Sequence, residues 1–88
     1  MAVGKNSLTP LYCVYMVKCR LGTLYTGYTN DIEKRLADHN NGKGAKYLRG
    51  KGPVELVYLK KFRTLSGALK AEIKIKKLSR KEKEILIK

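Results

Sequence analysis

Two runs of aromatic and β-branched residues near the start of the chain constrain its fold most, because only a short turn separates them. The first is LYCVYMVKC at residues 11–19, the second is LYTGYT at Leu24–Thr29, and RLGT lies between them. This composition favours strands, and a glycine-containing connection of a few residues favours a hairpin. We therefore expect residues 11–29 to form two antiparallel strands.

The register of that hairpin decides how its tyrosines are placed. We expect Tyr15 to pair with Tyr25, which would also pair Cys13 with Gly27 and put both rings on one face of the sheet. Paired aromatic residues stabilise sheets, so packing alone explains two such tyrosines. They become candidates for chemistry only if other polar side chains join them.

A first helix is expected directly after the hairpin, in the segment NDIEKRLADHN. Asn30 followed three positions later by Glu33 is typical of a helix start. Ile32 and Leu36 give the helix a short apolar stripe, which would pack against the sheet.

The second half of the chain predicts a loop, a third strand and two more helices. Residues 41–53 are glycine-rich and end in a proline, which is typical of a loop, and residues 54–62 have strand composition. Thr64 is placed to begin a helix over residues 65–78, and Ser79 to begin a short final one. The chain is therefore predicted to have an α+β fold in the order β-β-α-β-α-α, a small three-stranded sheet with flanking helices.

The length of 88 residues suits one small domain. We expect a flexible tail at residues 1–9 and a single domain at residues 10–88, with no secretion signal and no apolar run long enough to span a bilayer. Cys13 and Cys19 would lie about 20 Å apart on one strand, too far for a disulfide. This favours a reduced, cytoplasmic compartment.

The strong positive charge of this basic protein predicts a polyanionic partner. Twenty Lys and Arg against seven Asp and Glu give a net charge of +13. Self-repulsion of this size destabilises a compact chain, so a negatively charged partner is expected. Nucleic acid ranks ahead of an anionic membrane, and a ribosome-bound protein would carry the same charge. Charge alone does not choose among these classes, and no protein partner can be inferred.

Arg35 and His39 lie four positions apart and so share one face of the first helix. At the edge of the apolar stripe, a guanidinium and an imidazole can reach a phosphate in a cleft. The simpler interpretation is a solvated flank, with Arg35 paired to Asp31 or Asp38. His39 is the only histidine in the chain, and it titrates near neutral pH, which weakens that simpler interpretation.

Glu72 occupies a position where an apolar residue is expected. The apolar side of the second helix runs through Leu65, Leu69 and Ile73, and Glu72 falls on it. A carboxylate there needs an ion pair or a bound cation. An ion pair with Lys76 stabilises an exposed helix by only about 0.2–0.5 kcal/mol. A magnesium ion, held by one or two carboxylates and a substrate phosphate, is the better explanation.

Together, and in this order, these segments resemble the GIY-YIG nuclease domain. CVY at residues 13–15 and YTG at residues 25–27 resemble the two motifs that name the family, with cysteine and threonine where glycine and isoleucine are usual. TNDIEKRLADHN is similar to the first-helix motif, and ALKAEIKIKKL to the later motif whose glutamate holds the metal. The match is best with the small single-domain bacterial GIY-YIG proteins.

The resemblance implies an endonuclease, a hydrolase that cleaves phosphodiester bonds of DNA with Mg²⁺ or Mn²⁺; RNA stays open as a substrate. Glu72 would hold the metal and Arg35 would neutralise the phosphate. Tyr15 or Tyr25 would orient or deprotonate the attacking water, with positive charge nearby to stabilise the phenolate. His39 would position the water, share its proton or be the base itself. A non-catalytic nucleic-acid-binding module with the same fold is the alternative.

The glycine-rich loop carries the residues expected to bind nucleic acid. Lysine and arginine side chains can follow a phosphate backbone, and a tyrosine among them can stack on an exposed base. A flexible, soluble loop is the simpler interpretation of any one of them. The predicted set is Lys43, Lys46, Tyr47, Arg49 and Lys51.

Overall fold

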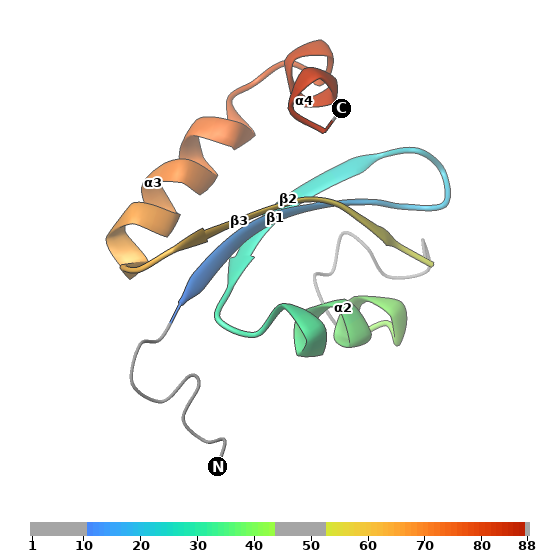
Figure 1. Cartoon of the computed structure of the whole chain (residues 1–88). Coiled ribbons are helices and arrows are strands. Elements are labelled where there is room, and N and C mark those ends of the chain that lie inside the picture. Colours follow the sequence, from blue (N-terminus) through green and yellow to red (C-terminus); the bar gives the residue numbers. More distant parts are fainter. Residues whose placement is uncertain (1–10, 44–52, 88) are drawn as a thin grey trace.

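A three-stranded antiparallel sheet with helices on both faces forms the protein (Figure 1). The computed structural model describes residues 11–43 and 53–87. The predicted α+β class and element order are confirmed. The strands are β1 (Tyr12–Lys18), β2 (Leu24–Thr29) and β3 (Glu55–Phe62), in the sheet order β2-β1-β3, and the helices are α2 (Ile32–Asn40), α3 (Leu65–Lys76) and α4 (Arg80–Leu86).

The central strand β1 is buried on both sides, so its alternating side chains build two hydrophobic clusters. Tyr15 and Val17 lie on the face that α2 covers. Val14 and Met16 lie on the face that α3 covers. A strand buried on both faces needs a continuous apolar run, which is what the first strand segment of the sequence supplies.

The hairpin register differs by two residues from the predicted one. Tyr15 pairs with Gly27, and Tyr25 pairs with Val17, so the prediction that the two tyrosines are direct partners is wrong. A shift of two residues keeps every side chain on its own face, and the tyrosines therefore still share one. The connecting turn contains Gly22 with a φ of 90°, a left-handed conformation that glycine adopts readily.

Strand β3 has a bulge opposite the centre of β1. Met16 pairs with Tyr58, whereas Val17 pairs with Leu56, so Val57 is the extra residue. The bulge places Val57 and Tyr58 together on the α3 face, while Leu56 packs on the α2 face. Neither composition nor alternation in the sequence predicted this irregularity.

Helix starts follow the predicted side-chain caps with one exception. Thr64 caps α3, and Ser79 forms a capping box with Glu82 at the start of α4. Helix α2 is capped by Asp31 and not by Asn30 as predicted. The reason is that Ile32 is its first helical residue, and the capping side chain comes immediately before that position.

The buried side of α3 is rotated relative to the predicted stripe. Ala68 and Ile75 are buried, whereas Leu65 and Ile73 are exposed, the latter by 53%. Glu72 lies between Ala68 and Ile75 on the inward side, and its side chain is only 13% exposed. The prediction failed for the two exposed residues because the line that contacts the sheet is set by tertiary packing.

Cys13 and Cys19 are both buried and are present as thiols. Residues 1–9, predicted to form a tail, lie outside the described residues. Within the described ranges, no helix has the length and apolar character needed to cross a membrane.

Candidate active site

Tyr15 and His39 meet in a buried polar contact between β1 and α2. The Tyr15 hydroxyl oxygen lies 2.9 Å from Nε2 of His39. Tyr15 is 0% exposed and His39 is 2% exposed. Polar groups removed from water destabilise a protein unless they pair, and these two pair with each other. His39, expected at the edge of the buried surface, is inside it.

Tyr25 completes a cluster of three rings with Tyr15 and His39. Its ring centroid lies 6.4 Å from that of Tyr15 and 5.7 Å from that of His39. Gly27 makes room for this cluster, because a Cβ atom at residue 27 would lie 2.7 Å from the Tyr15 hydroxyl oxygen. This spatial role of Gly27 was missed in the sequence, where its place in the YTG motif was the only signal.

Arg35 lies one turn before His39 on α2. One of its terminal nitrogens donates to the backbone carbonyl of Tyr28 at 3.4 Å. The Asp38 carboxylate forms an ion pair with Lys34 at 3.2 Å, so the alternative Arg35–Asp38 ion pair does not form. Arg35 also lines a shallow groove of about 380 Å³, where its charge can meet a ligand.

Burial controls the protonation of the Tyr15–His39 pair. Burial raises the pKa of Tyr15 above its ordinary value of 10.0, and the effect of Arg35 opposes this without overcoming it. Burial, with the charge of Arg35, lowers the pKa of His39 below its ordinary value of 6.5. Both side chains are therefore neutral at pH 7. The charge of Arg35 acts in the direction expected to stabilise a phenolate, but in the metal-free protein burial has the larger effect on Tyr15.

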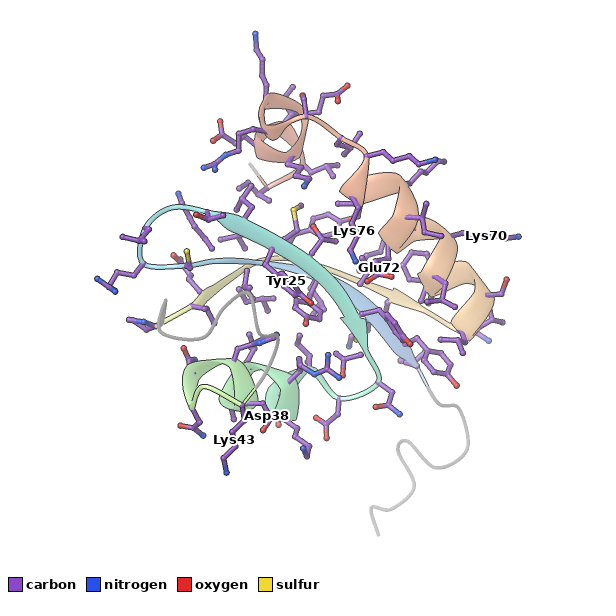
Figure 2. The ribbon with its side chains drawn as sticks, turned by 180° about the vertical axis from the view of Figure 1, so that it is seen from behind. Tyr25, Asp38, Lys43, Lys70, Glu72 and Lys76 are labelled. Carbon is purple, nitrogen blue, oxygen red and sulfur yellow. The ribbon has the colours of Figure 1, made fainter. Side chains whose placement is uncertain are left out.

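Glu72 approaches this cluster from α3, on the other face of the sheet. Helix α3 lies against β2 as well as β1, and Figure 2 shows Glu72 and Lys76 on its side toward the sheet, whereas Lys70 points away. The Glu72 carboxylate lies 3.3 Å from Nζ of Lys76, as the simpler interpretation predicted. Burial is the main cause of the raised pKa of Tyr15, and the charge of Glu72 adds a small contribution in the same direction.

The donor groups around Glu72 fit a magnesium-type ion. Among the described residues, no three His, Cys, Asp or Glu side chains are grouped to hold a metal. Zinc sites take three or four protein ligands, so this donor set does not suit zinc. Magnesium and manganese accept hard oxygen donors, and magnesium keeps several waters and uses one or two carboxylates with substrate phosphates. One shielded carboxylate meets that requirement.

Thr26 offers another oxygen on the face of β2 that α3 covers. Its cross-strand partner Met16 packs in the α3 cluster, which places Thr26 on the same face. The Thr26 hydroxyl is buried and has no hydrogen-bond partner among the described residues. Buried hydroxyls without a protein partner are rare, and a water or an ion commonly satisfies them. In the sequence, Thr26 was seen only as a replacement for isoleucine.

The structure locates only part of the predicted nucleic-acid surface. Lys43 is exposed and follows the end of α2, near Asp38 (Figure 2). The amide of Val54 donates to the Asn40 side chain at 2.7 Å, which holds the two ends of the loop together. That contact was not predicted from the sequence. The other predicted residues, Lys46, Tyr47, Arg49 and Lys51, lie outside the described residues.

Comparison with known proteins identifies the family to which this chain belongs. The model of the GIY-YIG catalytic domain matches residues 11–85. The chain belongs to the GIY-YIG family. This confirms the resemblance seen in the sequence and places the chain in a family of nucleases, which act on nucleic acid and generally use divalent metal ions.

Its relatives are UPF0213 proteins. One from Staphylococcus saprophyticus is 57% identical over 74 residues, which are 84% of this chain and 90% of that protein. One from Halobacterium salinarum is 49% identical over 76 residues, 86% of this chain and 99% of that protein. The solution NMR structure of a UPF0213 protein from Bacillus halodurans shares 44% identity with a TM-score of 0.58, covering 88% of this chain and 82% of that one. A solution NMR structure from E. faecalis shares 46% identity with a TM-score of 0.60, covering 84% and 79%.

Proposed function

We propose that this protein is a metal-dependent endonuclease that hydrolyses phosphodiester bonds of DNA. The observation that carries the proposal is the buried contact of 2.9 Å between the Tyr15 hydroxyl and Nε2 of His39. Apolar side chains would pack this position with no desolvation penalty. A neutral phenol beside a neutral imidazole instead supplies a path for a proton.

The division of roles between the phenols follows from their burial. Tyr25 is half-buried, whereas Tyr15 is fully buried in the free protein. Tyr25 therefore orients the attacking water, and Tyr15 receives the water's proton once substrate binding admits that water to its hydroxyl. As the water oxygen bonds to phosphorus and the P–O bond to the leaving oxygen breaks, Tyr15 passes its own proton to Nε2 of His39. No phenolate accumulates in this relay, which therefore tolerates the raised pKa of Tyr15.

Arg35 and Glu72 act on the phosphate. The guanidinium of Arg35 neutralises charge that develops on the phosphate oxygens. Glu72 would hold Mg²⁺ or Mn²⁺, with the Thr26 hydroxyl available to a water of the metal's shell. When bound, the ion polarises the phosphate and stabilises the leaving oxygen. Lys76 must release the Glu72 carboxylate before this can happen.

The net charge of +13 supports nucleic acid as the substrate, with phosphate contacts from exposed cations such as Lys43. DNA is the proposed substrate, and RNA is the other polymer to test. The thiol form of Cys13 and Cys19 supports a reducing, cytoplasmic location.

Nicking of supercoiled plasmid with Mg²⁺ or Mn²⁺ tests the function. We expect the wild type to nick and EDTA to stop it. Glu72→Gln should nick at least about 100-fold more slowly, the scale of losing one electrostatic stabiliser, while DNA binding survives. Lys74→Met is the control on the same helix, because Lys74 forms none of the ion pairs of Glu72. Equal nicking by wild type and Glu72→Gln contradicts the proposal, and binding with no nicking indicates the non-catalytic module.

A further inference from the structure

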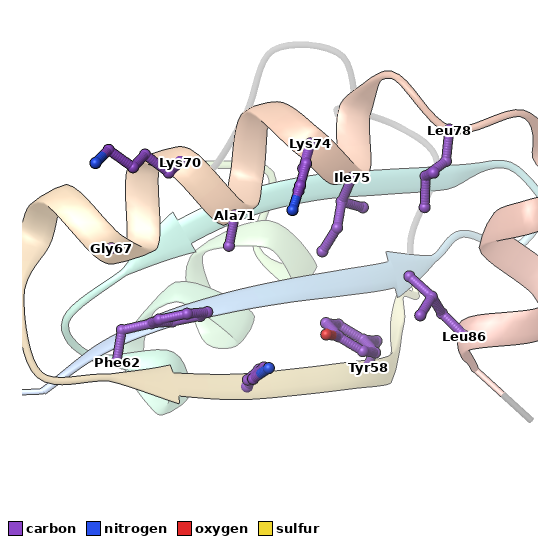
Figure 3. Close-up of a pocket in the computed structure, with 10 residues that line it drawn as sticks. Tyr58, Phe62, Gly67, Lys70, Ala71, Lys74, Ile75, Leu78 and Leu86 are labelled. Carbon is purple, nitrogen blue, oxygen red and sulfur yellow. The ribbon is translucent and has the colours of Figure 1, made fainter.

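A second concave surface lies on the α3 face of the sheet, on the side of β3 (Figure 3). We call it the β3 groove. It has a volume of about 680 Å³, in the range typical of ligand pockets. Its apolar lining comes from three elements: Tyr58 and Phe62 on β3, Ile75 and Leu78 on or just after α3, and Leu86 on α4. The ring cluster of the active site lies on the opposite, α2 face.

Local sequence keeps the β3 groove open. Helix α3 lies more over β1 and β2 than over β3. Gly67 and Ala71 line the groove with little or no side chain, and the bulge at Val57 sets Tyr58 onto this face. Leu86 remains substantially exposed. A contiguous apolar surface left open on a small domain marks a binding site, because filling it from within would add stability.

Lysines surround this apolar surface. Lys60 on β3 and Lys70 and Lys74 on α3 line the groove, and no acidic residue of the described ranges lines it. Lys70 and Lys74 are four positions apart and therefore form a row along the helix. The cations in the ion pairs of the described residues are Lys34, Lys76 and Arg80. The three lysines of the groove take part in none of these pairs.

We propose that the β3 groove binds an acidic amphipathic helix of a partner protein. Apolar side chains on one face of such a helix would lie over Tyr58, Ile75 and Leu86, as in other helix-in-groove complexes. Acidic residues four apart along its flank would face Lys70 and Lys74. The partner helix would cover the part of the sheet near β3 that α3 leaves open.

Two other occupants fit the groove less well. Nucleic acid presents phosphates and sugars, which gain little from an apolar floor, and Nζ of Lys60 already lies 5.6 Å over the Phe62 ring, where a base would stack. A second copy of this chain would bring lysines against lysines at a net charge of +13 each. An acidic amphipathic helix offers apolar side chains to the apolar lining of the groove and carboxylates to its lysines.

A titration followed by NMR tests this proposal. The probe is a synthetic peptide of about 15 residues, with leucines on one face and glutamates four apart beside them. We expect chemical-shift changes confined to amides around the groove, and none with a scrambled peptide of the same composition. The Lys70→Glu, Lys74→Glu double variant should bind about tenfold more weakly, equivalent to about 1.4 kcal/mol. The charge-matched Lys77→Glu, Lys81→Glu variant should bind like the wild type, because both of its positions lie outside the groove.

A variant without a charge change makes the test independent of net charge. Ala71→Leu fills the groove and should abolish peptide binding while leaving metal-dependent nicking intact. Equal losses in both charge variants, or shift changes spread over all lysines, would overturn the proposal. A single-stranded oligonucleotide that shifts the groove amides when the peptide does not would assign the groove to nucleic acid instead.

Discussion

The two faces of the sheet differ in what they bury and what they leave open. On the α2 face, the polar side chains of Tyr15 and His39 are sealed from solvent and bonded to each other. On the α3 face, the interior is apolar around Val14 and Met16, while an apolar groove beside it stays open and is lined by lysines. A domain of this size has little stability to lose, so both departures from simple packing suggest function. Buried polar groups suggest chemistry, and open apolar groups suggest recognition.

Removal of the Tyr15 hydroxyl on the α2 face should have the largest effect on the nicking rate. Tyr15→Phe deletes the proton path to His39 and should slow nicking by about 100-fold or more, as expected for a positioned acid–base group. Tyr25→Phe leaves the Tyr15–His39 contact intact and should therefore slow nicking less than Tyr15→Phe does. Single-turnover nicking rates at saturating Mn²⁺ measure both, with circular dichroism as the check on folding. A larger loss in Tyr25→Phe would move the proton transfer to that phenol.

Added volume should act in opposite directions on the two faces. Gly27→Ala places a methyl group against the Tyr15 hydroxyl, and overpacking of this kind costs about 1–3 kcal/mol of unfolding free energy. Ala71→Leu adds a larger group to the open β3 groove, and its stability should equal or exceed that of the wild type. Urea unfolding compares the two variants. Wild-type stability for Gly27→Ala would mean that the ring cluster is loosely packed.

Lys76 should compete with the metal for Glu72. Lys76→Met removes the ammonium that lies 3.3 Å from the carboxylate. Without DNA, its affinity for Mn²⁺ should rise about twofold or more, since such a pair is worth about 0.2–0.5 kcal/mol when exposed and more when shielded. Electron paramagnetic resonance of free Mn²⁺ measures this, with Lys74→Met as the control for charge. Equal affinities in the two variants would show that the ion binds away from Glu72.

Loss of the Thr26 hydroxyl on the α3 face should have the smallest effect of these substitutions. Unlike Gly27→Ala, it should not lower the free energy of unfolding. Thr26→Val replaces a buried hydroxyl that has no partner among the described residues. Unfolding free energy should stay level or rise by up to about 1 kcal/mol, because no hydrogen bond is lost. Thermal unfolding checks this, and a clear loss of stability would reveal a partner for the hydroxyl. Mn²⁺ affinity should fall slightly if the hydroxyl contacts the metal's water shell.

Features encoded by neighbours in sequence were predicted well. The strands, the element order and the caps at Thr64 and Ser79 depend on local composition and spacing. Glu72 was identified because an acid on an apolar helix face is unusual, and its low exposure agrees with that. The family resemblance then assembled Arg35, His39 and the tyrosines into one expected site.

Features that depend on distant neighbours were not predicted. The hairpin register, the bulge at Val57 and the rotation of α3 all result from packing between elements. The role of Gly27 depends on the Tyr15 ring across the strand, and the protonation of Tyr15 depends on burial that composition does not reveal. The β3 groove is formed by three elements that meet only in the folded chain.

The pH dependence of nicking tests the proton route through Tyr15 and His39 most directly. His39 can accept a proton only when neutral, and its pKa is lowered below 6.5 by burial and by Arg35. Single-turnover nicking with Mn²⁺ should therefore stay level as pH falls through 7 and decline only below pH 6.5, as the imidazole becomes protonated. His39→Gln should be slow and should lack this decline. A wild-type rate that already falls above pH 6.5, or a profile unchanged in His39→Gln, would contradict the proposed route.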